Sequence, residues 1–188
     1  VHEQILHLGG EKEWKYMVQS YLACINYVDA QIGRFLDELK ENPRNRDTVI
    51  VLTSDHGWNL GEKTHWCKAA IWRDTTRVPF IVVSPGVAKA GFRNNQPISH
   101  IDIYPSLCDF AGIPKPTHLE GRSILPLLKD PSATRDFAFL SYGPQNTAAQ
   151  SERYRYLRYE DGSEELYDHQ KDPHEWTNLI GDKKYQKQ

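Results

Sequence analysis

Apolar residues recur every three or four positions between residues 14 and 41, which predicts a long amphipathic helix. The stripe consists of Trp14, Met17, Val18, Tyr21, Leu22, Ile25, Val28, Ile32, Phe35, Leu36 and Leu39. We expect Asn42 and Pro43 to end this helix, because proline cannot continue a helix and biases the residue before it away from helical geometry.

Two short runs of branched apolar residues follow the helix. The run 48–53 does not alternate between apolar and polar positions, which is typical of a strand buried on both faces of a parallel sheet. The run 78–83 is similar, and Pro79 is expected at a strand start or a sheet edge. A second helix is predicted from Ile101 to Ala111, with Gly112 as its C-terminal cap. This order of elements predicts an α/β fold.

The pattern changes after Asp130 and Pro131, where we expect a small antiparallel sheet to begin. Its predicted strands are 136–142, 154–159 and 165–167. Asp161 and Gly162 form a strong hairpin-turn signal before the last of these strands. Residues 172–175 predict a turn into a short helix, and the polar tail 183–188 is expected to fray. We therefore expect two parts, residues 1–130 and 131–188.

Composition adds limits rather than a function. Among 188 residues, 39% are hydrophobic and 26% charged, which is typical of globular domains, and the net charge is −2. There is no basic excess to bind nucleic acid, and no apolar run approaches the roughly 20 residues that span a bilayer. The chain starts at Val1 without a basic or apolar leader, so we expect no signal peptide in it. Three scattered cysteines do not predict a disulfide scaffold.

The segment 54–68 carries the candidate chemistry. Asp55 and His56 are the first groups to leave a predicted strand, in the crevice where open α/β sheets usually bind ligands. Gly57 permits a sharp turn, and Lys68 can return to the same crevice as a point charge for an oxyanion. In an arbitrary protein an Asp-His pair is usually a loop or capping feature, and a lone lysine is usually solvated. Here the position after a strand favours a metal and anion site.

We also expect the loop between Gly57 and Lys68 to be held against the sheet by three apolar side chains, Trp58, Leu60 and Trp66. Such anchoring would bring Lys68 back toward Asp55. The alternative interpretation is that the tryptophans belong to the core and that Lys68 points to water.

The chain resembles the type I sulfatases of the alkaline phosphatase superfamily, most closely the iduronate-2-sulfatase-like and bacterial carbohydrate sulfatase branch. The segments that carry the resemblance are 21–25, 28–33, 54–68, 72–73, 76–79, 166–168, 172–175 and 178–179. The resemblance covers nearly the whole chain. It implies the C-terminal part of an alkaline-phosphatase-like α/β sandwich over residues 1–130, followed by the family's small antiparallel C-terminal subdomain.

Specific roles follow from the resemblance alone. It implies that Asp55 and His56 ligate a divalent metal, usually Ca²⁺, although many relatives have asparagine in place of His56. Oxygen ligation suits this hard cation, whereas imidazole is a less usual ligand for it. Lys68 matches the lysine that holds the sulfate and neutralises charge during cleavage. Trp58 and His65 lie where this branch often contacts the sugar, and a packing role is an equal alternative for both.

Much of a sulfatase site is missing from the sequence. Sulfatases use a formylglycine made from Cys or Ser within C/S-x-P-x-R, and no cysteine or serine here stands in that motif. The family's paired N-terminal aspartates are also absent. We therefore expect a chain that is inactive alone, completed by an N-terminal part of the same protein, with a sulfated small molecule or saccharide as substrate. The family is mostly periplasmic, secreted or lysosomal.

Two alternatives remain open from the sequence. The first is a phosphodiesterase or phosphonate hydrolase of the same superfamily, which shares the metal pair and the lysine and differs mainly upstream. The second is a non-catalytic fragment that folds as a binding or structural module. The nucleophile residue would distinguish the enzymes.

Overall fold

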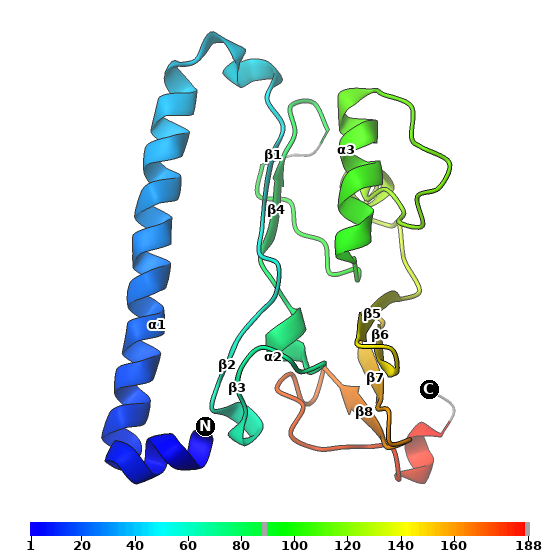
Figure 1. Ribbon diagram of the computed structural model, residues 1–188. Coiled ribbons are helices and arrows are strands. Elements are labelled where there is room, and N and C mark those ends of the chain that lie inside the picture. Colours follow the sequence, from blue (N-terminus) through cyan, green and yellow to red (C-terminus); the bar gives the residue numbers. More distant parts are fainter. Residues whose placement is uncertain (88–89, 187–188) are drawn as a thin grey trace.

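A computed structural model describes residues 1–87 and 90–186 of the chain (Figure 1). Helix α1 (His2–Glu41) runs along one side of the molecule and begins well before the predicted start at residue 14. It bends at Gly10, whose φ of 59° costs glycine little. The predicted end is confirmed, because Asn42 is the C-terminal cap and a 3₁₀ turn, η1 (Pro43–Asp47), follows.

The apolar stripe of α1 is largely uncovered in this structure. Its exposed members include Met17, Leu22, Ile25, Val28 and Phe35. Length alone does not make α1 a membrane helix, since none of the helices in the described ranges is apolar enough to cross a bilayer. The predicted helix is therefore present, but its apolar face is only partly used within this chain.

Strands β1 (Ile50–Thr53) and β4 (Phe80–Val83) pair antiparallel, with Ile50 opposite Val83. The prediction of parallel strands buried on both faces is wrong here. The chain leaves β1, makes a hairpin excursion and re-enters at the same end of the pair, whereas parallel pairing needs a crossover to the opposite end. Neither strand is fully buried, and Ile81 and Val83 are exposed.

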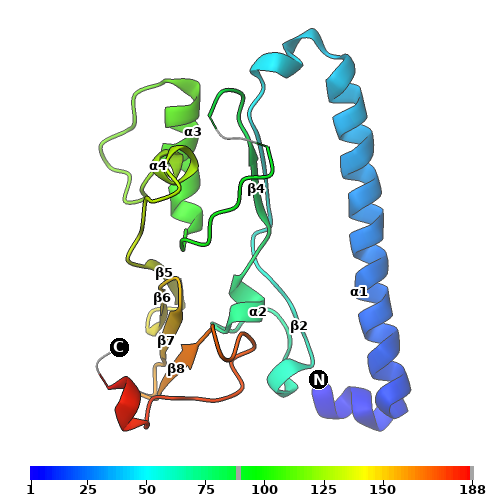
Figure 2. The ribbon, with the colours of Figure 1, turned by 180° about the vertical axis from the view of Figure 1, so that it is seen from behind.

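The excursion between these strands builds the candidate site. It contains a short hairpin, β2 (Asn59–Leu60) and β3 (Trp66–Cys67), joined by the 3₁₀ turn η2 (Glu62–Thr64). Helix α2 (Arg73–Thr76) follows and leads into β4, which begins at Phe80, directly after Pro79, two residues later than the predicted run. Figure 2 shows α2 between β4 and the C-terminal sheet.

The second predicted helix is confirmed as α3 (Ile103–Ala111), which the 3₁₀ turn η3 (His100–Asp102) precedes. Gly112 caps α3 in the left-handed conformation, with φ 66° and ψ 28°. A short helix, α4 (Leu125–Lys129), then precedes the C-terminal sheet.

The predicted antiparallel sheet is confirmed as a four-stranded meander in the order β5-β6-β7-β8. Its strands are β5 (Ala138–Tyr142), β6 (Asn146–Gln150), β7 (Tyr154–Arg158) and β8 (Glu164–Asp168). Sequence analysis missed β6, which lacks branched aliphatic and aromatic residues.

The short helix predicted after residues 172–175 is wrong. Glu175 adopts φ 60°, a left-handed conformation that α-helices do not contain, and its side chain turns inward. The only regular turn in the described residues beyond it is the 3₁₀ turn η4 (Lys183–Tyr185). The expected fraying lies partly at residues 187–188, outside the described residues.

The main buried cluster joins the excursion to the C-terminal sheet. Ile71, just before α2, packs with Ala148, Leu157 and Tyr167 of β6, β7 and β8. Trp72 lies against the same cluster. The boundary at residue 130 stays a prediction, but this packing links residues on both sides of it.

A buried ion pair closes the sheet near its end. Asp168 is fully buried, and its carboxylate accepts two hydrogen bonds from Arg153, at 2.9 Å from Nε and 2.6 Å from Nη2. The Arg153 hydrogen bonds, aided by the backbone N–H of Gln170 and by nearby positive charge, outweigh burial and lower the pKa of Asp168.

We predict that this pair makes stability fall in acid. A folded-state pKa below the unfolded value of about 3.9 gives stability that is complete above that value and lost as pH falls through the folded pKa. Asp168→Asn should cost roughly 1–3 kcal/mol at pH 7, discounted for the partly exposed Arg153. Urea unfolding across pH 7 to 2 should show a shallower acid loss in this variant. The exposed Asp29→Asn should keep the parent profile, and identical profiles for Asp168→Asn and the parent would refute the assignment.

Candidate functional site

Asp55 and His56 lie at the end of β1 and form a carboxylate–imidazole pair. Asp55 Oδ1 accepts the backbone N–H of His56 at 3.0 Å, and Oδ2 lies 3.3 Å from His56 Nε2. The Asp55 side chain is 82% exposed, so its carboxylate is open to an incoming group.

The hydrogen bond on the other side of the imidazole fixes which nitrogen carries the proton. His56 Nδ1 lies 2.8 Å from the carbonyl oxygen of Gly57, and a carbonyl can only accept, so Nδ1 donates. In the neutral ring the lone pair is then on Nε2, facing Asp55. Two acceptors 3.3 Å apart repel unless a proton or a cation lies between them. The pair is therefore suited to hold a cation or, once the ring is protonated, to form an ion pair.

The local charges keep Asp55 ionised. Local desolvation raises its pKa, but the charge that His56 carries when protonated, local backbone hydrogen bonds and the charge of Lys68 together lower it below the usual value.

Lys68 is exposed, and one side-chain hydrogen bond holds its backbone. Its carbonyl oxygen accepts from His65 Nε2 at 2.9 Å, and the His65 ring packs edge-on against Trp72 with centroids 5.7 Å apart. The residues on either side, Cys67 and Ala69, have φ values of 69° and 72°. Non-glycine residues rarely adopt this conformation, and such backbone strain concentrates at functional sites. His65 thus orients the Lys68 peptide, whether or not it also contacts a ligand.

Trp58 lies between His56 and α1. Its ring stacks on His56 with centroids 6.0 Å apart and on Tyr21 with centroids 6.3 Å apart. At 36% exposure it is both a packing residue and accessible to a ligand. The stacking limits rotation of the His56 ring and thereby supports the orientation of Nε2.

The backbone of the turn rests directly on α2. Gly57 N–H donates to the carbonyl oxygen of Thr75 at 2.8 Å, and Trp58 N–H donates to that of Asp74 at 2.9 Å. A Cβ atom at Gly57 would lie 2.0 Å from the Asp74 carbonyl oxygen. Glycine is therefore required here for close approach, and α2 determines where Asp55 and His56 project.

The expected anchoring of the loop by the sheet is wrong for Trp66. Its ring is buried against Trp14 of α1, with centroids 6.2 Å apart, and its Nε1 donates to His2 Nδ1 at 3.1 Å. Trp14 Nε1 in turn donates to the carbonyl oxygen of Leu60 at 2.6 Å. The first turns of α1 anchor the hairpin, because they extend beyond the predicted helix start and reach the loop.

Sequence analysis missed Lys63, which attaches the loop to the C-terminal part of the chain. Lys63 Nζ donates to the Tyr167 hydroxyl at 3.2 Å and to the backbone carbonyl of Glu175. The same ammonium lies over the rings of Trp72 and Tyr167, at 5.1 and 4.9 Å from their centroids. In the sequence Lys63 is one more charge in a polar loop, so no pattern pointed to this role.

Asp55 and His56 offer one carboxylate and one imidazole as possible metal donors. Across the ranges that the structure describes, no group of three or more His, Cys, Asp or Glu side chains is arranged to hold a metal. Ca²⁺ takes roughly six to eight oxygen ligands. The exposed Asp55 carboxylate fits such an ion chemically, and the pair with His56 would need further ligands to complete it.

Two family models match the chain. The model described as "Sulfatase" matches residues 7–113, and "N-sulphoglucosamine sulphohydrolase, C-terminal" matches residues 61–188. A "Sulfatase" of Formosa agariphila is 39% identical over 174 residues, covering 92% of this chain and 34% of the relative. An "N-acetylglucosamine-6-O-sulfatase" of Bacteroides thetaiotaomicron is 33% identical over 190 residues, covering 93% and 34%. The chain thus spans about a third of the length of these curated relatives.

Solved structures of related proteins match the fold of this chain. One holds its substrate D-glucosamine-2-N,6-O-disulfate and matches with a TM-score of 0.79 at 30% identity, covering 93% of this chain and 38% of that one. A phosphonate monoester hydrolase of Agrobacterium radiobacter matches with a TM-score of 0.73 at 31% identity, covering 86% and 36%. The expected C-terminal part of an alkaline-phosphatase-like fold is confirmed.

The contact between Gly57 and α2 generates a prediction. Gly57→Ala should lower the free energy of unfolding by roughly 1–3 kcal/mol, because the new methyl group would displace the turn from the Asp74 carbonyl. Gly33→Ala is the matched control, since its Cβ meets nothing within 4 Å on the exposed face of α1. That control should gain roughly 0.5–1 kcal/mol from helix propensity. Urea titration of both variants measures the difference, and equal stabilities would rule out the close approach.

Proposed function

This chain belongs to the sulfatase family, and from that premise we propose that it forms the C-terminal part of an enzyme that hydrolyses sulfate esters of carbohydrates. The observation that carries the proposal is the pairing of Asp55 and His56 at the end of β1, where Asp55 Oδ2 lies 3.3 Å from His56 Nε2, and Lys68 is the proposed third member of the site. The saccharide substrate class is inferred from relatives described as acting on sulfated sugars.

In this proposal Lys68 binds the sulfate group. A point charge fixed beside the ester stabilises the negative charge that develops on the sulfate oxygens as the S–O bond breaks. His65 and the strained backbone around Lys68 hold its peptide in place, which limits the reorganisation needed when substrate binds. Trp58 and His65 are the proposed sugar contacts.

Asp55 and His56 are the proposed metal ligands. The carboxylate oxygen and the Nε2 lone pair face one side of the turn, and the donation from Nδ1 to Gly57 maintains that lone pair. A divalent cation such as Ca²⁺, when bound, would polarise the sulfate oxygens. Stacking on Trp58 restricts the orientation of the His56 ring and so supports this role.

The proposed partner is the N-terminal part of the same protein, which would supply the formylglycine nucleophile and the remaining metal ligands. Two observations support it. The chain spans about a third of its curated relatives, and large apolar side chains are exposed along α1 and on β4. Exposed apolar surface of this extent marks an interface.

A phosphonate monoester hydrolase is the second candidate, favoured by the structural similarity to such an enzyme at 31% identity. The two activities share the residues discussed above and differ in the nucleophile region. Relative rates of the intact enzyme on sulfate and phosphonate esters separate them. A non-catalytic module would hydrolyse neither.

We predict that Lys68→Ala in the intact enzyme lowers kcat/KM for a sulfated saccharide by about 10²–10³, because one charge-stabilising donor is lost. Lys40→Ala is the control, since Lys40 lies in the last turn of α1 and pairs with Asp37 on the surface. It should retain parent activity. Unchanged kcat/KM in Lys68→Ala would end the proposed role.

We further predict that the 188-residue chain alone neither turns over a chromogenic aryl sulfate with added Ca²⁺ nor binds Ca²⁺ tightly. Two ligands cannot fill the roughly six to eight positions of this ion. A denatured sample is the control for turnover, and Asp55→Asn is the control for calorimetry. Stoichiometric tight binding that Asp55→Asn leaves intact would show a different, complete site.

A further inference from the structure

We propose that Glu175 is a positioning residue that holds the candidate site from the C-terminal sheet. The inference deepens the proposed function, on which its meaning for the reaction rests. Glu175 is remote from Asp55 and Lys68 in sequence and acts through α2 and the β2–β3 hairpin. It has three sets of contacts, one to its own subdomain and two to the elements that carry the site.

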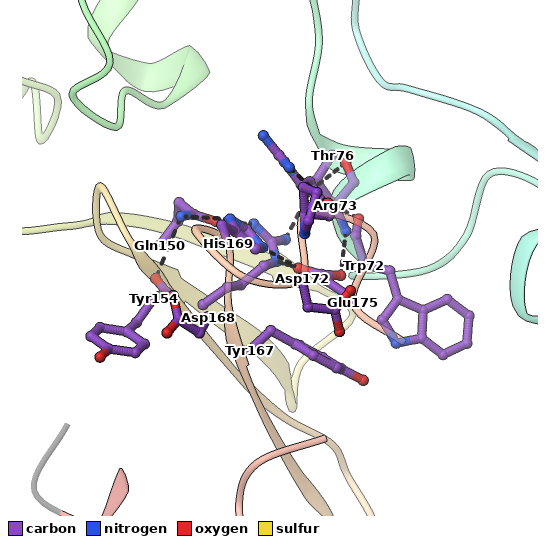
Figure 3. A network of polar contacts seen from close by, with 12 residues as sticks. Trp72, Arg73, Thr76, Gln150, Tyr154, Tyr167, Asp168, His169, Asp172 and Glu175 are labelled. Atoms are coloured by element: carbon purple, nitrogen blue, oxygen red, sulfur yellow. Dashed lines mark hydrogen bonds and ion pairs between the residues drawn. The ribbon is translucent and has the colours of Figure 1, made fainter. Parts of the chain in front are cut away.

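The Glu175 carboxylate is 1% exposed and fully engaged (Figure 3). Oε2 accepts a hydrogen bond from the backbone N–H of Arg73 at 2.9 Å. Arg73 is the first residue of α2. Oε1 lies 2.8 Å from His169 Nε2 and 3.5 Å from Arg155 Nε. The residue is held at φ 60°, which a non-glycine residue keeps only where its surroundings determine it.

Arg155 extends the same hold to both ends of α2. This buried guanidinium donates from Nη2 to the carbonyl oxygen of Ile71 at 2.6 Å and to Thr76 Oγ1 at 2.8 Å. Glu175 provides the opposite charge that compensates its burial. Glu175 therefore fixes the first residue of α2 directly. Arg155 fixes Ile71, just before the helix, and Thr76, its last residue.

Helix α2 transmits this position to the metal pair. The carbonyl groups of Asp74 and Thr75, inside α2, accept the N–H groups of Trp58 and Gly57. These are the two residues that follow His56, and the carbonyl oxygen of Gly57 also accepts a hydrogen bond from His56 Nδ1. A displacement of α2 would thus displace the imidazole by the same backbone contacts.

The Glu175 backbone holds the second arm of the site. Its carbonyl oxygen accepts from Lys63 Nζ, and Lys63 lies in η2, the turn of the hairpin that leads to Lys68. One residue of the C-terminal part therefore contacts both the support of Asp55 and His56 and the loop that carries Lys68. A residue that merely stabilised the sheet would have no reason to contact both.

The experiment is hydrogen exchange on the full chain with Glu175→Gln. Glutamine keeps the size and an acceptor for Arg73 N–H, but removes the charge that faces Arg155 and His169. We expect the amides of Gly57 and Trp58 to exchange at least about tenfold faster, while the amides of β6 and β7 change by less than about twofold. Glu164→Gln is the matched control, because this carboxylate lies on β8 and contacts Tyr156 rather than α2. It should leave all these rates unchanged.

Unchanged exchange at Gly57 and Trp58, or an equal rise throughout β6 and β7, would overturn the positioning role. Should Glu175→Gln fail to fold, Thr76→Val must raise the same two rates. This variant removes the Arg155 acceptor on α2, together with the local bonds from Thr76 Oγ1 to the carbonyls of Trp72 and Arg73. In the intact enzyme, Glu175→Gln should lower kcat about tenfold with less effect on KM for a sulfate ester. Altered exchange without any ester hydrolysis by the parent would refute the proposed function and leave the positioning role standing.

Discussion

The approach of one backbone turn to one short helix determines the candidate site. Gly57 and Trp58 donate their N–H groups to carbonyls in the middle of α2, at 2.8 and 2.9 Å. Hydrogen bonds between backbone groups tolerate little displacement, and the 2.0 Å that a Cβ would reach leaves no room for any residue but glycine. Asp55 and His56 therefore project from a platform whose position depends on whatever holds α2.

Polar residues buried beside the C-terminal sheet hold that platform. Glu175, Arg155 and His169 lie together with little exposed surface, and such groups stabilise a fold only modestly once desolvation is counted. Arg155 Nε makes an ion pair with Glu175 at 3.5 Å rather than a hydrogen bond. An apolar cluster could join the same elements with less cost. What a carboxylate and a guanidinium add is direction, because each addresses a particular N–H or carbonyl of α2.

The side of the molecule formed by α1 and β4 exposes apolar surface. The stripe on α1 and the outer residues of β4 expose large apolar side chains, which water disfavours. The curated relatives are about three times as long as the matched segment, and the proposed N-terminal part would supply cover for these side chains. The candidate site thus lies between the C-terminal part, which contacts it through polar groups, and the exposed apolar side chains of α1 and β4.

The sequence determined what depends on neighbouring residues. The end of α1 at Asn42, the cap of α3 at Gly112 and the hairpin turn at Asp161 and Gly162 follow from steric preferences of proline and glycine. The resemblance to sulfatases and the placement of Asp55 and His56 after a strand were also visible there. These features need no knowledge of distant residues.

Only the tertiary structure decided which distant groups meet. The antiparallel direction of β1 and β4, the packing of Trp66 on α1 and the left-handed Glu175 contradict expectations from local pattern. An apolar run predicts a strand with apolar neighbours, but it does not predict the direction of the neighbouring strand. The parts of Lys63 and Glu175 left no trace in the sequence, because an ion pair or hydrogen bond across more than a hundred residues imposes no spacing on either segment. It exists only once the chain has brought the two ends together.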